Sequence, residues 1–336
     1  MKILIYSPMF HPSVGGLETM VSVLAHEFVR QGQEVKLVCR TEADDPGAFP
    51  FEVIRGAGPR RLLKLTRWCD VFFQANVSLK GVWPLLLAPR PLVVTHQSWY
   101  RRPDGRVGWQ DRLKQRVTKF AANISASESV ANHLSSSSAV IPNSYREDTF
   151  YLMPEAPRTK QLVFLGRLVS DKGGDLLLDA LARLKLRGLR PRLTVIGGGP
   201  EELNLRRQAE ALGIDMQVAF AGVKTGLELT RMLNEHQIMV VPSRWLEPFG
   251  IVALEGIACG CVVVGSEGGG LKDAIGPCGV TFPNGDVAAL TQALADLLTD
   301  EKGLAGYRAP AKAHLLRHRK DSVAASYLEV LEAAIA

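Results

Sequence analysis

The sequence lacks several features that would place it in a specialised class of protein. No hydrophobic run reaches the ~20 residues that span a bilayer, because Pro84, Pro89 and Pro91 interrupt the most apolar stretch at 82–94. The five cysteines include no CxxC pair and do not form an even set. A disulfide framework is therefore excluded, and we expect the thiols to be small core residues of a protein in a reducing compartment.

The amino-terminal sequence MKILIYSP also lacks the features of a secretory leader. It contains one lysine followed by a short β-like run, and we interpret it as the first strand of the fold. We therefore expect a cytoplasmic protein. With 336 residues, of which 46% are hydrophobic, the chain is long enough for two domains of about 150 residues each.

Short apolar segments typical of buried β-strands recur along the chain and alternate with segments of helical periodicity. In the first half the predicted strands are 2–6, 35–39, 71–74, 92–95, 123–126 and 139–141. In the second half they are 161–165, 192–196, 216–220, 238–241, 261–264 and 279–282. Strands that are apolar nearly throughout indicate parallel sheets covered on both faces. The pattern predicts an α/β protein with two doubly wound, Rossmann-like domains.

A polar segment with three prolines, 142–160, separates the two series of strands and suits a linker. We place the N-terminal domain at 1–150 and the C-terminal domain at 151–320. A terminal helix at 321–336 is expected to return to the N-terminal domain. Ligands of doubly wound sheets bind at the carboxyl ends of the strands, so the loops that follow the strands are the candidate sites.

Positive charge is concentrated in the first half of the chain. The first 150 residues contain 19 Lys and Arg against 13 Asp and Glu, whereas the remaining residues are balanced. Seven of these bases lie at 101–119, where Trp109, Leu113, Val117 and Phe120 recur at helical spacing. We favour packing of this apolar stripe on the first sheet, while the bases can still face an anionic membrane. The stretch lacks spaced aromatic platforms, so nucleic acid is not an expected partner.

The strand at 161–165 is followed by a loop rich in groups that bind anions. Gly166 permits a tight exit from the strand, and Arg167 follows it directly. Asp171 is predicted to cap a helix that begins with Lys172, so a guanidinium, an ammonium and free helix N–H groups converge there. This combination suits a diphosphate. The alternative is an ordinary capped helix with a surface arginine and lysine.

The glycine-rich turn at 197–199 follows the next predicted strand. Glu201 and Glu202 fall in the first turn of the helix after it, where they compensate the helix dipole and repel an anion. We therefore interpret these glycines as a close strand-to-helix connection that borders the site.

The sequence EPFGIVALEG, at 247–256, places Glu247 before a turn and Glu255 inside an apolar helix. Carboxylates are rarely buried without partners. Helical side chains lean toward the N-terminus, so Glu255 should point back toward the loop that holds Glu247. Both acids can then accept hydrogen bonds from the hydroxyls of one polyhydroxyl ligand. The alternative is that each acid meets a lysine or arginine within its own domain.

Two further strand ends in the first half carry candidate residues. Gly15 and Gly16 open a helix after the first strand and permit close approach of a ligand to the backbone. His96 ends the apolar strand VVTH, where an α/β protein presents reactive side chains. A plain turn and a structural histidine are the respective alternatives.

Taken together, the motifs GGLE, VVTH, GRLVSDKGG, IGGGP and EPFGIVALEG resemble those of the family four retaining glycosyltransferases, which have the GT-B fold. The resemblance covers nearly the whole chain. Its most specific element is the Glu-x7-Glu motif combined with the upstream Gly-Arg…Asp-Lys-Gly loop. It implies two Rossmann-like domains facing a central cleft, with the acceptor on the N-terminal side and the nucleotide-sugar donor on the C-terminal side.

The resemblance also implies a role for each matching residue. Arg167 and Lys172 would hold the donor diphosphate, which Gly15 and Gly16 would approach from the first domain. His96 would act as a catalytic residue beside the anomeric centre.

The Glu-x7-Glu motif supplies the remaining implied roles. Glu247 would be the second catalytic residue, and Glu255, with Gly166, would bind the nucleoside through its ribose hydroxyls. The donor sugar would be held by Glu247 and the backbone of Phe249, Gly250 and Ile251. The sequence departs from the family pattern at IPNSYRED, where an Asn-Gly turn is usual, at Gly256 in place of alanine, and at Gln97 in place of aspartate.

The implied reaction moves a sugar from a nucleotide diphosphate sugar, expected to be a UDP-sugar, to a hydroxyl acceptor of a surface polysaccharide or glycolipid. Lipid-linked acceptors and peripheral contact with the inner face of a membrane fit this reading. We expect retention by front-face attack, because both glutamates are committed to binding. No cofactor or metal is expected, since the chain has no Asp-x-Asp motif. The alternatives are an inverting GT-B transferase, a sugar-nucleotide epimerase, or a non-catalytic nucleotide-sugar binding protein.

Overall fold

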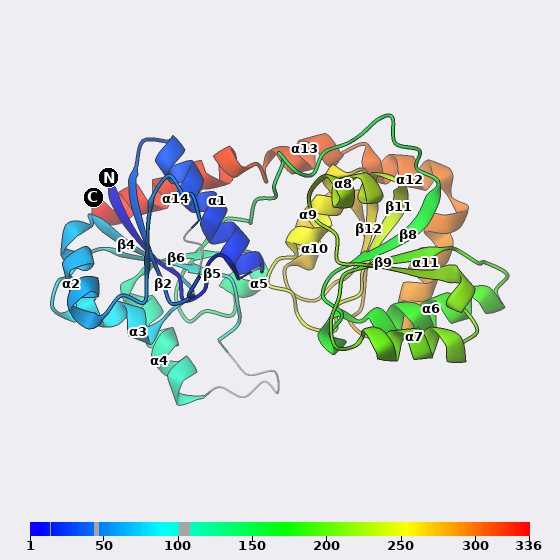
Figure 1. The fold of residues 1–336 in the computed structure, drawn as a ribbon, viewed down its shortest axis with the longest axis horizontal. Coiled ribbons are helices and arrows are strands. Elements are labelled where there is room, and N and C mark those ends of the chain that lie inside the picture. The colour runs from blue at the N-terminus through cyan, green and yellow to red at the C-terminus, as the bar shows by residue number, and fades with distance from the viewer. Residues whose placement is uncertain (14, 44–46, 101–107) are drawn as a thin grey trace. The chain divides into compact units, whose positions relative to one another are not determined.

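The computed structural model describes residues 1–13, 15–43, 47–100 and 108–336. The chain divides into two compact units (Figure 1). The first unit contains Met1–Ser144 and Lys320–Ala336, and the second contains Tyr145–Arg319. Each unit is built around one sheet in which every described strand pair is parallel. The prediction of two doubly wound α/β domains is confirmed.

The sheet of the first unit has seven strands in the order β3-β2-β1-β4-β5-β6-β7. The strands are β1 (Lys2–Tyr6), β2 (Glu34–Cys39), β3 (Glu52–Arg55), β4 (Val71–Ala75), β5 (Leu92–His96), β6 (Ala122–Ser125) and β7 (Ala139–Val140). The sequence did not predict β3, because this short edge strand is polar and half exposed rather than apolar throughout. The order reverses between β1 and β4, which creates a topological switch point at their carboxyl ends.

Helices cover both faces of the first sheet. They are α1 (Gly16–Arg30), α2 (Pro59–Trp68), α3 (Leu79–Val82), α4 (Trp109–Val117), α5 (Glu128–Ala131) and α14 (Lys320–Ile335). Alternate residues of β1 point to opposite faces, so Ile3 and Ile5 pack with α1 and α14, whereas Leu4 and Tyr6 pack toward α2. Helices α1 and α14 lie side by side on the same face (Figure 1).

The sheet of the second unit has six strands in the order β10-β9-β8-β11-β12-β13. The strands are β8 (Lys160–Leu165), β9 (Leu193–Ile196), β10 (Val218–Gly222), β11 (His236–Val241), β12 (Val262–Ser266) and β13 (Gly279–Phe282). All six correspond to predicted segments. Here the order reverses between β8 and β11, so the loops that leave these two strands flank the switch point of the sheet.

The helices of the second unit also form two layers. They are α6 (Gly174–Leu186), α7 (Glu202–Ala211), α8 (Gly226–Asn234), α9 (Ile251–Ala258), α10 (Leu271–Ile275), α11 (Val287–Thr299), α12 (Glu301–Arg308) and α13 (Ala311–Leu316). Helices α6, α7 and α11 pack with one face of the sheet, and α8, α9 and α10 lie over the other (Figure 1). Strands β8 and β11, at the centre, are thereby buried on both faces.

The segment after Ser144 is built into the second unit rather than free between the two units. The Thr230 hydroxyl donates a hydrogen bond to the Thr149 carbonyl at 2.7 Å. The Asn234 side chain accepts from the Met153 amide at 2.8 Å and donates to the Tyr151 carbonyl at 2.9 Å. The polar, proline-containing sequence that suggested a linker is therefore hydrogen-bonded to α8.

The basic stretch at 101–119 was predicted to pack its apolar stripe on the first sheet, and the structure differs from this prediction. Residues 101–107 lie outside the described part of the chain, and α4 with the turn that follows it covers the rest. Trp109 is 72% exposed, Phe120 is 85% exposed and Leu113 is 39% exposed. The prediction that this stripe packs on the sheet is therefore wrong for these three of its four residues. Helix α4 itself has no buried residue. In the described residues, no helix is both long and apolar enough to pass through a membrane.

All five cysteines are buried and none forms a disulfide, as the sequence predicts. The core of the first unit depends on residues separated by most of the chain. Tyr327 of α14 is fully buried, and its hydroxyl lies 2.8 Å from that of Thr95 on β5. The C-terminal helix therefore completes a core that the first 144 residues leave open on one face.

We predict that Leu331→Ala, in the buried face of α14, destabilises the first unit by roughly 2–5 kcal/mol, the usual result of truncating a buried leucine. Urea denaturation, followed by fluorescence, measures the change. Leu186→Ala is the matched control, because Leu186 is 88% exposed on α6. An unfolding transition that does not move in Leu331→Ala would contradict the assignment of α14 to this core.

Candidate functional site

The loop after β8 begins the candidate site of the second unit. Gly166 leaves the strand and donates a backbone hydrogen bond to Ile196 at 3.0 Å. Arg167 is exposed, and within the described part of the chain no side chain pairs with its guanidinium. A single turn of 3-10 helix, Ser170–Lys172, then leads to Gly173 and α6. Arg167 is thus a free cation at the carboxyl end of a central strand.

The predicted helix cap at Asp171 is wrong, because α6 begins at Gly174 and Gly173 is its N-cap. Gly173 has a left-handed φ of 68°, and a Cβ atom at this position would lie 2.0 Å from the Pro242 carbonyl oxygen. Only glycine fits this approach. The Asp171 carbonyl instead accepts the Arg244 amide at 2.8 Å. The loop after β8 and the loop after β11 are therefore held together by their backbones.

An ion pair joins the same two loops through their side chains. Lys172 Nζ donates to Glu247 Oε1 at 2.5 Å, and the Ser243 hydroxyl donates to the same oxygen at 2.7 Å. Both charged side chains are largely buried, with 25% of Lys172 and 13% of Glu247 exposed. The sequence assigned these two residues to one site, and the structure brings them together. Ser243, which completes the cluster, carries no sequence signal that distinguishes it from other loop serines.

Neighbouring loops fix the backbone around Glu247. Its carbonyl accepts the Gly270 amide at 2.7 Å, and Glu247 forms an isolated parallel bridge with Gly269. The Asn284 side chain accepts from the Gly268 amide at 2.7 Å and donates to the Ser243 carbonyl at 3.0 Å. One asparagine after β13 thereby connects the loops that follow β11 and β12, and the position of the Glu247 carboxylate is determined by three loops.

The turn between Glu247 and α9 presents backbone donors. Gly250 is the N-cap with a φ of 100°, no side chain caps the helix, and its first turn contains no acid. The N–H group of Ile251, at the first position of the helix, is therefore oriented as a donor. The Phe249 side chain is only 2% exposed and packs 5.7 Å from the His318 ring. Phe249 contributes its backbone to this surface and its ring to the core.

Glu255 lies one turn into α9 and has a different environment. Its carboxylate is 3.5 Å from the Arg146 guanidinium, and its side chain is 14% exposed. Burial raises the pKa of Glu255 to about 7, and the nearby Arg146 opposes this rise. Arg146 also lies over the Phe150 ring at 5.0 Å. Sequence reasoning missed Arg146, because it belongs to the segment that was interpreted as a linker.

The glycine-rich turn after β9 lies directly beside the β8 loop. The Leu168 amide donates to Gly198 at 2.9 Å, and the Leu168 carbonyl accepts from Glu201 at 3.0 Å. A Cβ atom on Gly197 would lie 1.9 Å from the Gly166 carbonyl oxygen. These contacts give the turn a supporting position beside Arg167 rather than a free anion-binding surface.

Gly15 and Gly16 lie at the start of α1 in the first unit. Gly15 is the N-cap, and no side chain caps the helix. However, Glu18 accepts a hydrogen bond from the Ser13 hydroxyl at 3.0 Å, and its other carboxylate oxygen would be 2.5 Å from a Cβ atom on Gly15. An anion at this helix terminus would therefore meet backbone donors together with an adjacent carboxylate.

His96 ends β5 in the first unit and is fully buried. Its Nε2 lies 3.0 Å from Asn123 Oδ1, and its Nδ1 lies 2.7 Å from the Tyr100 hydroxyl. Asn123 uses its amide group to donate to the Thr118 carbonyl, so its oxygen accepts and His96 Nε2 is the protonated nitrogen. Burial lowers the pKa of His96 to about 4. Both nitrogens of a neutral imidazole are thus satisfied inside the unit.

The candidate residues therefore form two separate sets. Arg167, Lys172, Glu247 and the start of α9 gather at the carboxyl edge of the second sheet, with Glu255 in the same helix. Gly15 and His96 lie at the carboxyl ends of β1 and β5 of the first sheet. Within the described residues, no group of three or more His, Cys, Asp or Glu is arranged to hold a metal ion.

Two solved structures resemble the chain over nearly its whole length. Sucrose-phosphate synthase of Thermosynechococcus elongatus has a TM-score of 0.83 at 20% identity, over 99% of this chain and 98% of that chain. HepE of Anabaena, solved with UDP, has a TM-score of 0.83 at 20% identity, over 99% of this chain and 100% of that chain. Identities this low establish the fold, which is the predicted GT-B fold.

Sequence similarity is concentrated in the second unit, where the model of the family described as "Glycosyl transferases group 1" matches residues 153–314. A GDP-mannose-dependent alpha-(1-6)-phosphatidylinositol monomannoside mannosyltransferase of Mycolicibacterium smegmatis is 36% identical over 42% of this chain and 39% of its own length. A D-inositol 3-phosphate glycosyltransferase of Corynebacterium jeikeium is 37% identical over 43% of this chain and 36% of its own length. The chain thus spans about two fifths of the length of these relatives. Over residues 153–314, the second unit therefore has the sequence of a group 1 glycosyltransferase domain, as its motifs predict.

The geometry of His96 predicts a mainly structural contribution. His96→Leu should lower the free energy of unfolding at pH 7, because the Tyr100 hydroxyl and Asn123 each lose a buried partner worth roughly 1–3 kcal/mol. The unfolded state binds a proton near pH 6.5 and the folded state only near 4, so wild-type stability falls as the pH drops between these values. The variant should lose less stability across this interval.

Urea denaturation at several pH values measures both effects, and Tyr100→Phe is the matched control, because it removes one hydrogen bond and keeps the ring. An His96→Leu protein with unchanged stability but greatly reduced turnover would contradict the structural role and support the catalytic one.

Proposed function

We propose that the chain transfers a sugar from a nucleotide diphosphate sugar to a hydroxyl acceptor with retention of configuration. The observation that carries this proposal is the cluster of Lys172, Glu247 and Ser243 beside the unpaired Arg167. It combines cations that suit a diphosphate with a carboxylate that suits sugar hydroxyls at one edge of the sheet. The family of the second unit supports the same reaction.

In the proposed donor complex, the ion pair between Lys172 and Glu247 exchanges its partners. The diphosphate is bound by Lys172 and Arg167, and hydroxyls of the donor sugar are bound by Glu247. A buried charge that loses its partner without replacement is costly. Because the donor supplies an anion and hydroxyls together, neither charged side chain is left uncompensated. A free sugar or a free phosphate compensates only one of them, which favours the intact nucleotide sugar.

Glu255 is proposed to bind the ribose of the nucleotide. Its pKa of about 7 leaves the carboxyl group partly protonated near neutral pH. Two ribose hydroxyls donate to the ionised form and stabilise it. Arg146, whose side chain is 44% exposed, supports the same charge from the solvent side. Phe249, Gly250 and Ile251 are proposed to bind the donor sugar through their backbone, and Gly166 to lie beside the nucleoside.

Retention is proposed to follow from front-face attack rather than from a covalent intermediate. The bond between the anomeric carbon and the diphosphate oxygen breaks, and the acceptor oxygen bonds to the same face of that carbon. The leaving diphosphate takes the acceptor proton. Arg167, Lys172 and the N-terminus of α9 stabilise the negative charge that develops on the diphosphate. Metal-independent transfer belongs to the same proposal.

An inverting transferase or an epimerase would need a base close to the reacting carbon. His96 was the candidate, but it is buried with both nitrogens bonded, which favours the retaining reaction. Analysis of the product anomer separates the two transfer reactions. A non-catalytic binding protein would bind the donor without releasing its sugar to an acceptor or to water.

The proposal is tested first by the donor and then by the division of labour between the two glutamates. A thermal-shift screen of UDP-, GDP- and ADP-sugars should identify one stabilising base, with about 2.7 kcal/mol gained at 100 times the dissociation constant. Glu255→Ala should weaken both the nucleotide sugar and the free nucleoside diphosphate by roughly 10–100-fold, the loss of hydrogen bonds to a charged group. Glu247→Ala should weaken only the nucleotide sugar.

Isothermal titration of each variant with both ligands measures this division. Glu267→Ala is the matched control, because Glu267 is an exposed acid in the nearby loop after β12. Equal losses for both ligands in both glutamate variants would contradict the assigned roles. Absence of binding for all the nucleotide sugars would contradict the function itself.

The exposed face around α4 favours a peripheral membrane contact as a second property of the protein. We propose that Trp109 and Phe120 enter the interface of an anionic bilayer while Arg112, Arg116 and Lys119 face its headgroups. The two aromatic rings are 72% and 85% exposed, and the three bases are exposed beside them. Exposed aromatics next to bases are typical of helices that lie on such membranes. A lipid-linked acceptor and a position on the inner face of the membrane agree with this contact.

Each base near an anionic surface contributes roughly 1 kcal/mol. Changing Arg112, Arg116 and Lys119 to serine should therefore abolish most pelleting with phosphatidylglycerol vesicles at low salt. Trp109→Ser with Phe120→Ser should also reduce it. The matched control changes Arg60, Lys64 and Arg67, three exposed bases of α2, to serine. Equal effects of the two triple variants would show general charge attraction rather than a defined surface.

A further inference from the structure

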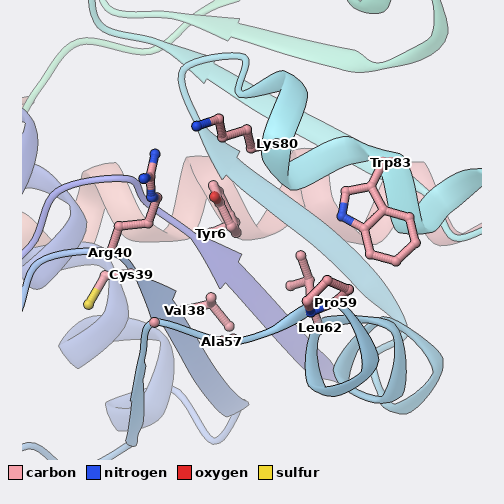
Figure 2. A pocket seen from close by; sticks show the side chains of 10 residues that line it. Tyr6, Val38, Cys39, Arg40, Ala57, Pro59, Leu62, Lys80 and Trp83 are labelled. Carbon is pink, nitrogen blue, oxygen red and sulfur yellow. The ribbon is translucent and has the colours of Figure 1, made fainter.

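The first unit contains a second concave site, at the carboxyl edge of its own sheet. A pocket of about 270 Å³ lies where β1, β2, β3 and β4 end (Figure 2). This edge includes the topological switch point between β1 and β4, where doubly wound sheets bind ligands. The volume is near the lower limit of ~300–1,000 Å³ for ligand pockets, which suits a ring-sized molecule rather than a polymer.

Two unpaired cations stand at this pocket. Arg40 directly follows β2 and Lys80 is the second residue of α3. Both side chains are exposed. Among the residues that the structure describes, neither side chain has a carboxylate or hydrogen-bond partner. Figure 2 shows Arg40 and Lys80 on the same side of the pocket, with Tyr6 between them. The described residues that line the pocket include no acid, and two bases that converge on one space in this way form a site for an anion.

The Tyr6 hydroxyl is an independent sign of a ligand. Tyr6 is only 4% exposed, and its ring is fixed between Phe72, 6.5 Å away, and Gly81, where a Cβ atom would lie 2.7 Å from the ring. Within the described part of the chain, its hydroxyl makes no hydrogen bond. The oxygen points toward the space between Arg40 and Lys80 in Figure 2. The ring of Tyr6 is thus buried while its hydroxyl opens on the pocket, where it is available to a bound molecule.

The start of α2 adds a third source of positive potential. This ten-residue helix begins at Pro59, which lines the pocket. No side chain caps its N-terminus, and its first turn contains no acid. Pro59 has no N–H group and the Leu62 amide donates to Gly58, so the donors that this turn offers are the backbone N–H groups of Arg60 and Arg61. The helix dipole favours an anion here.

The remaining wall of the pocket is apolar. Trp83, Pro59 and Leu62 lie on the side away from Arg40 (Figure 2). An indole ring suits the apolar face of a sugar or cyclitol ring. The pocket thus combines a cationic side with a flat apolar side, which matches a ring that carries one anionic group rather than a bare ion or a neutral sugar.

We propose that this pocket binds the acceptor and that the acceptor is a hydroxylated ring bearing a phosphate or carboxylate group. The anion is bound by Arg40, Lys80 and the Tyr6 hydroxyl, and the ring lies against Trp83. This inference rests on the proposed function, because it names the acceptor class of the same transferase. It concerns residues of the first unit alone.

The test is ligand-observed NMR with glucose 6-phosphate, glucuronate, glucose and inorganic phosphate as probes. The two anionic sugars, or one of them, should bind more tightly than glucose and inorganic phosphate. The one that binds identifies the anion as phosphate or carboxylate. Arg40→Ala with Lys80→Ala should weaken this binding by about tenfold or more, the loss expected for charge-assisted hydrogen bonds. Tyr6→Phe, which removes only the hydroxyl, should weaken it by a smaller factor.

The matched control is Arg67→Ala with Lys64→Ala, which removes the same charges from exposed positions of α2 that do not line the pocket and lie beyond its first turn. This control should leave the binding within twofold, and neither double variant should change the thermal shift produced by the nucleotide-sugar donor. Equal weakening by the two double variants would overturn the proposal, as would equal binding of glucose and its anionic derivatives. Absence of binding by both anionic sugars would also overturn it.

These outcomes are separable from those of the donor experiments. The NMR measurement needs neither donor nor turnover, and its variants lie in the first unit. Donor binding with no anionic-sugar binding overturns the acceptor class and leaves the transferase intact. If the protein binds an anionic sugar but no nucleotide sugar, the pocket is a ligand site of a protein that is not a glycosyltransferase, and its ligand is not an acceptor.

Discussion

The contact between Lys172 and Glu247 determines the form of the candidate donor site. It joins the loop after β8 to the loop after β11, the two loops that flank the switch point of the second sheet. The same loops are bonded through the Asp171 carbonyl, and the Ser243 hydroxyl donates to the carboxylate oxygen that Lys172 also contacts. A lysine and a glutamate that are both largely buried stabilise each other only at close distance. The pair therefore sets the spacing between the two surfaces that we propose for the diphosphate and the sugar of the donor.

The two glutamates of the motif have the same chemistry but different electrostatic environments. Glu247 has an ammonium and a hydroxyl donor on one oxygen, so its negative charge is compensated before any ligand binds. Glu255 has one guanidinium at 3.5 Å and is otherwise desolvated, which raises its pKa to about 7. A ligand at Glu247 must replace an existing partner, whereas a ligand at Glu255 supplies donors that are missing. Binding at Glu255 is therefore the more favourable of the two, and we propose that the nucleoside contributes most to the affinity for the donor.

Much of the fold and part of the site were predictable from the sequence, because both depend on local patterns. Apolar segments of strand length gave every strand except β3, whose polar residues and edge position weaken the signal. The anion-binding loop and the Glu-x7-Glu motif were recognisable from residue types at strand ends. Arg146 was missed because its contact with Glu255 spans 109 positions of the sequence, which no local pattern records. Ser243 lies only four positions from Glu247, but nothing in its residue type distinguishes it from other loop serines.

The two predictions that were wrong, the cap at Asp171 and the packing of the stripe on α4, failed for physical reasons. The cap at Asp171 was a sound local inference, but Gly173 approaches the Pro242 carbonyl so closely that the helix can begin only after it. The stripe on α4 has helical spacing, yet spacing alone does not say which surface covers it. A contact with another element decided the first outcome, and the lack of a covering element decided the second.

The surplus of basic residues in the first half of the chain can be explained by where these residues lie in the first unit. Surplus bases far from acids are unfavourable in a compact domain unless water or a ligand compensates them. Arg40 and Lys80 stand at the pocket of the first sheet, and Arg112, Arg116 and Lys119 stand around α4. The second unit, Tyr145–Arg319, is close to neutral, with 21 Lys and Arg against 20 Asp and Glu, and cations such as Lys172 and Arg146 lie beside the acids Glu247 and Glu255. In the functions that we propose, an anionic acceptor and an anionic membrane both act on the first unit, whereas the donor diphosphate meets a second unit in which Lys172 is already paired with Glu247.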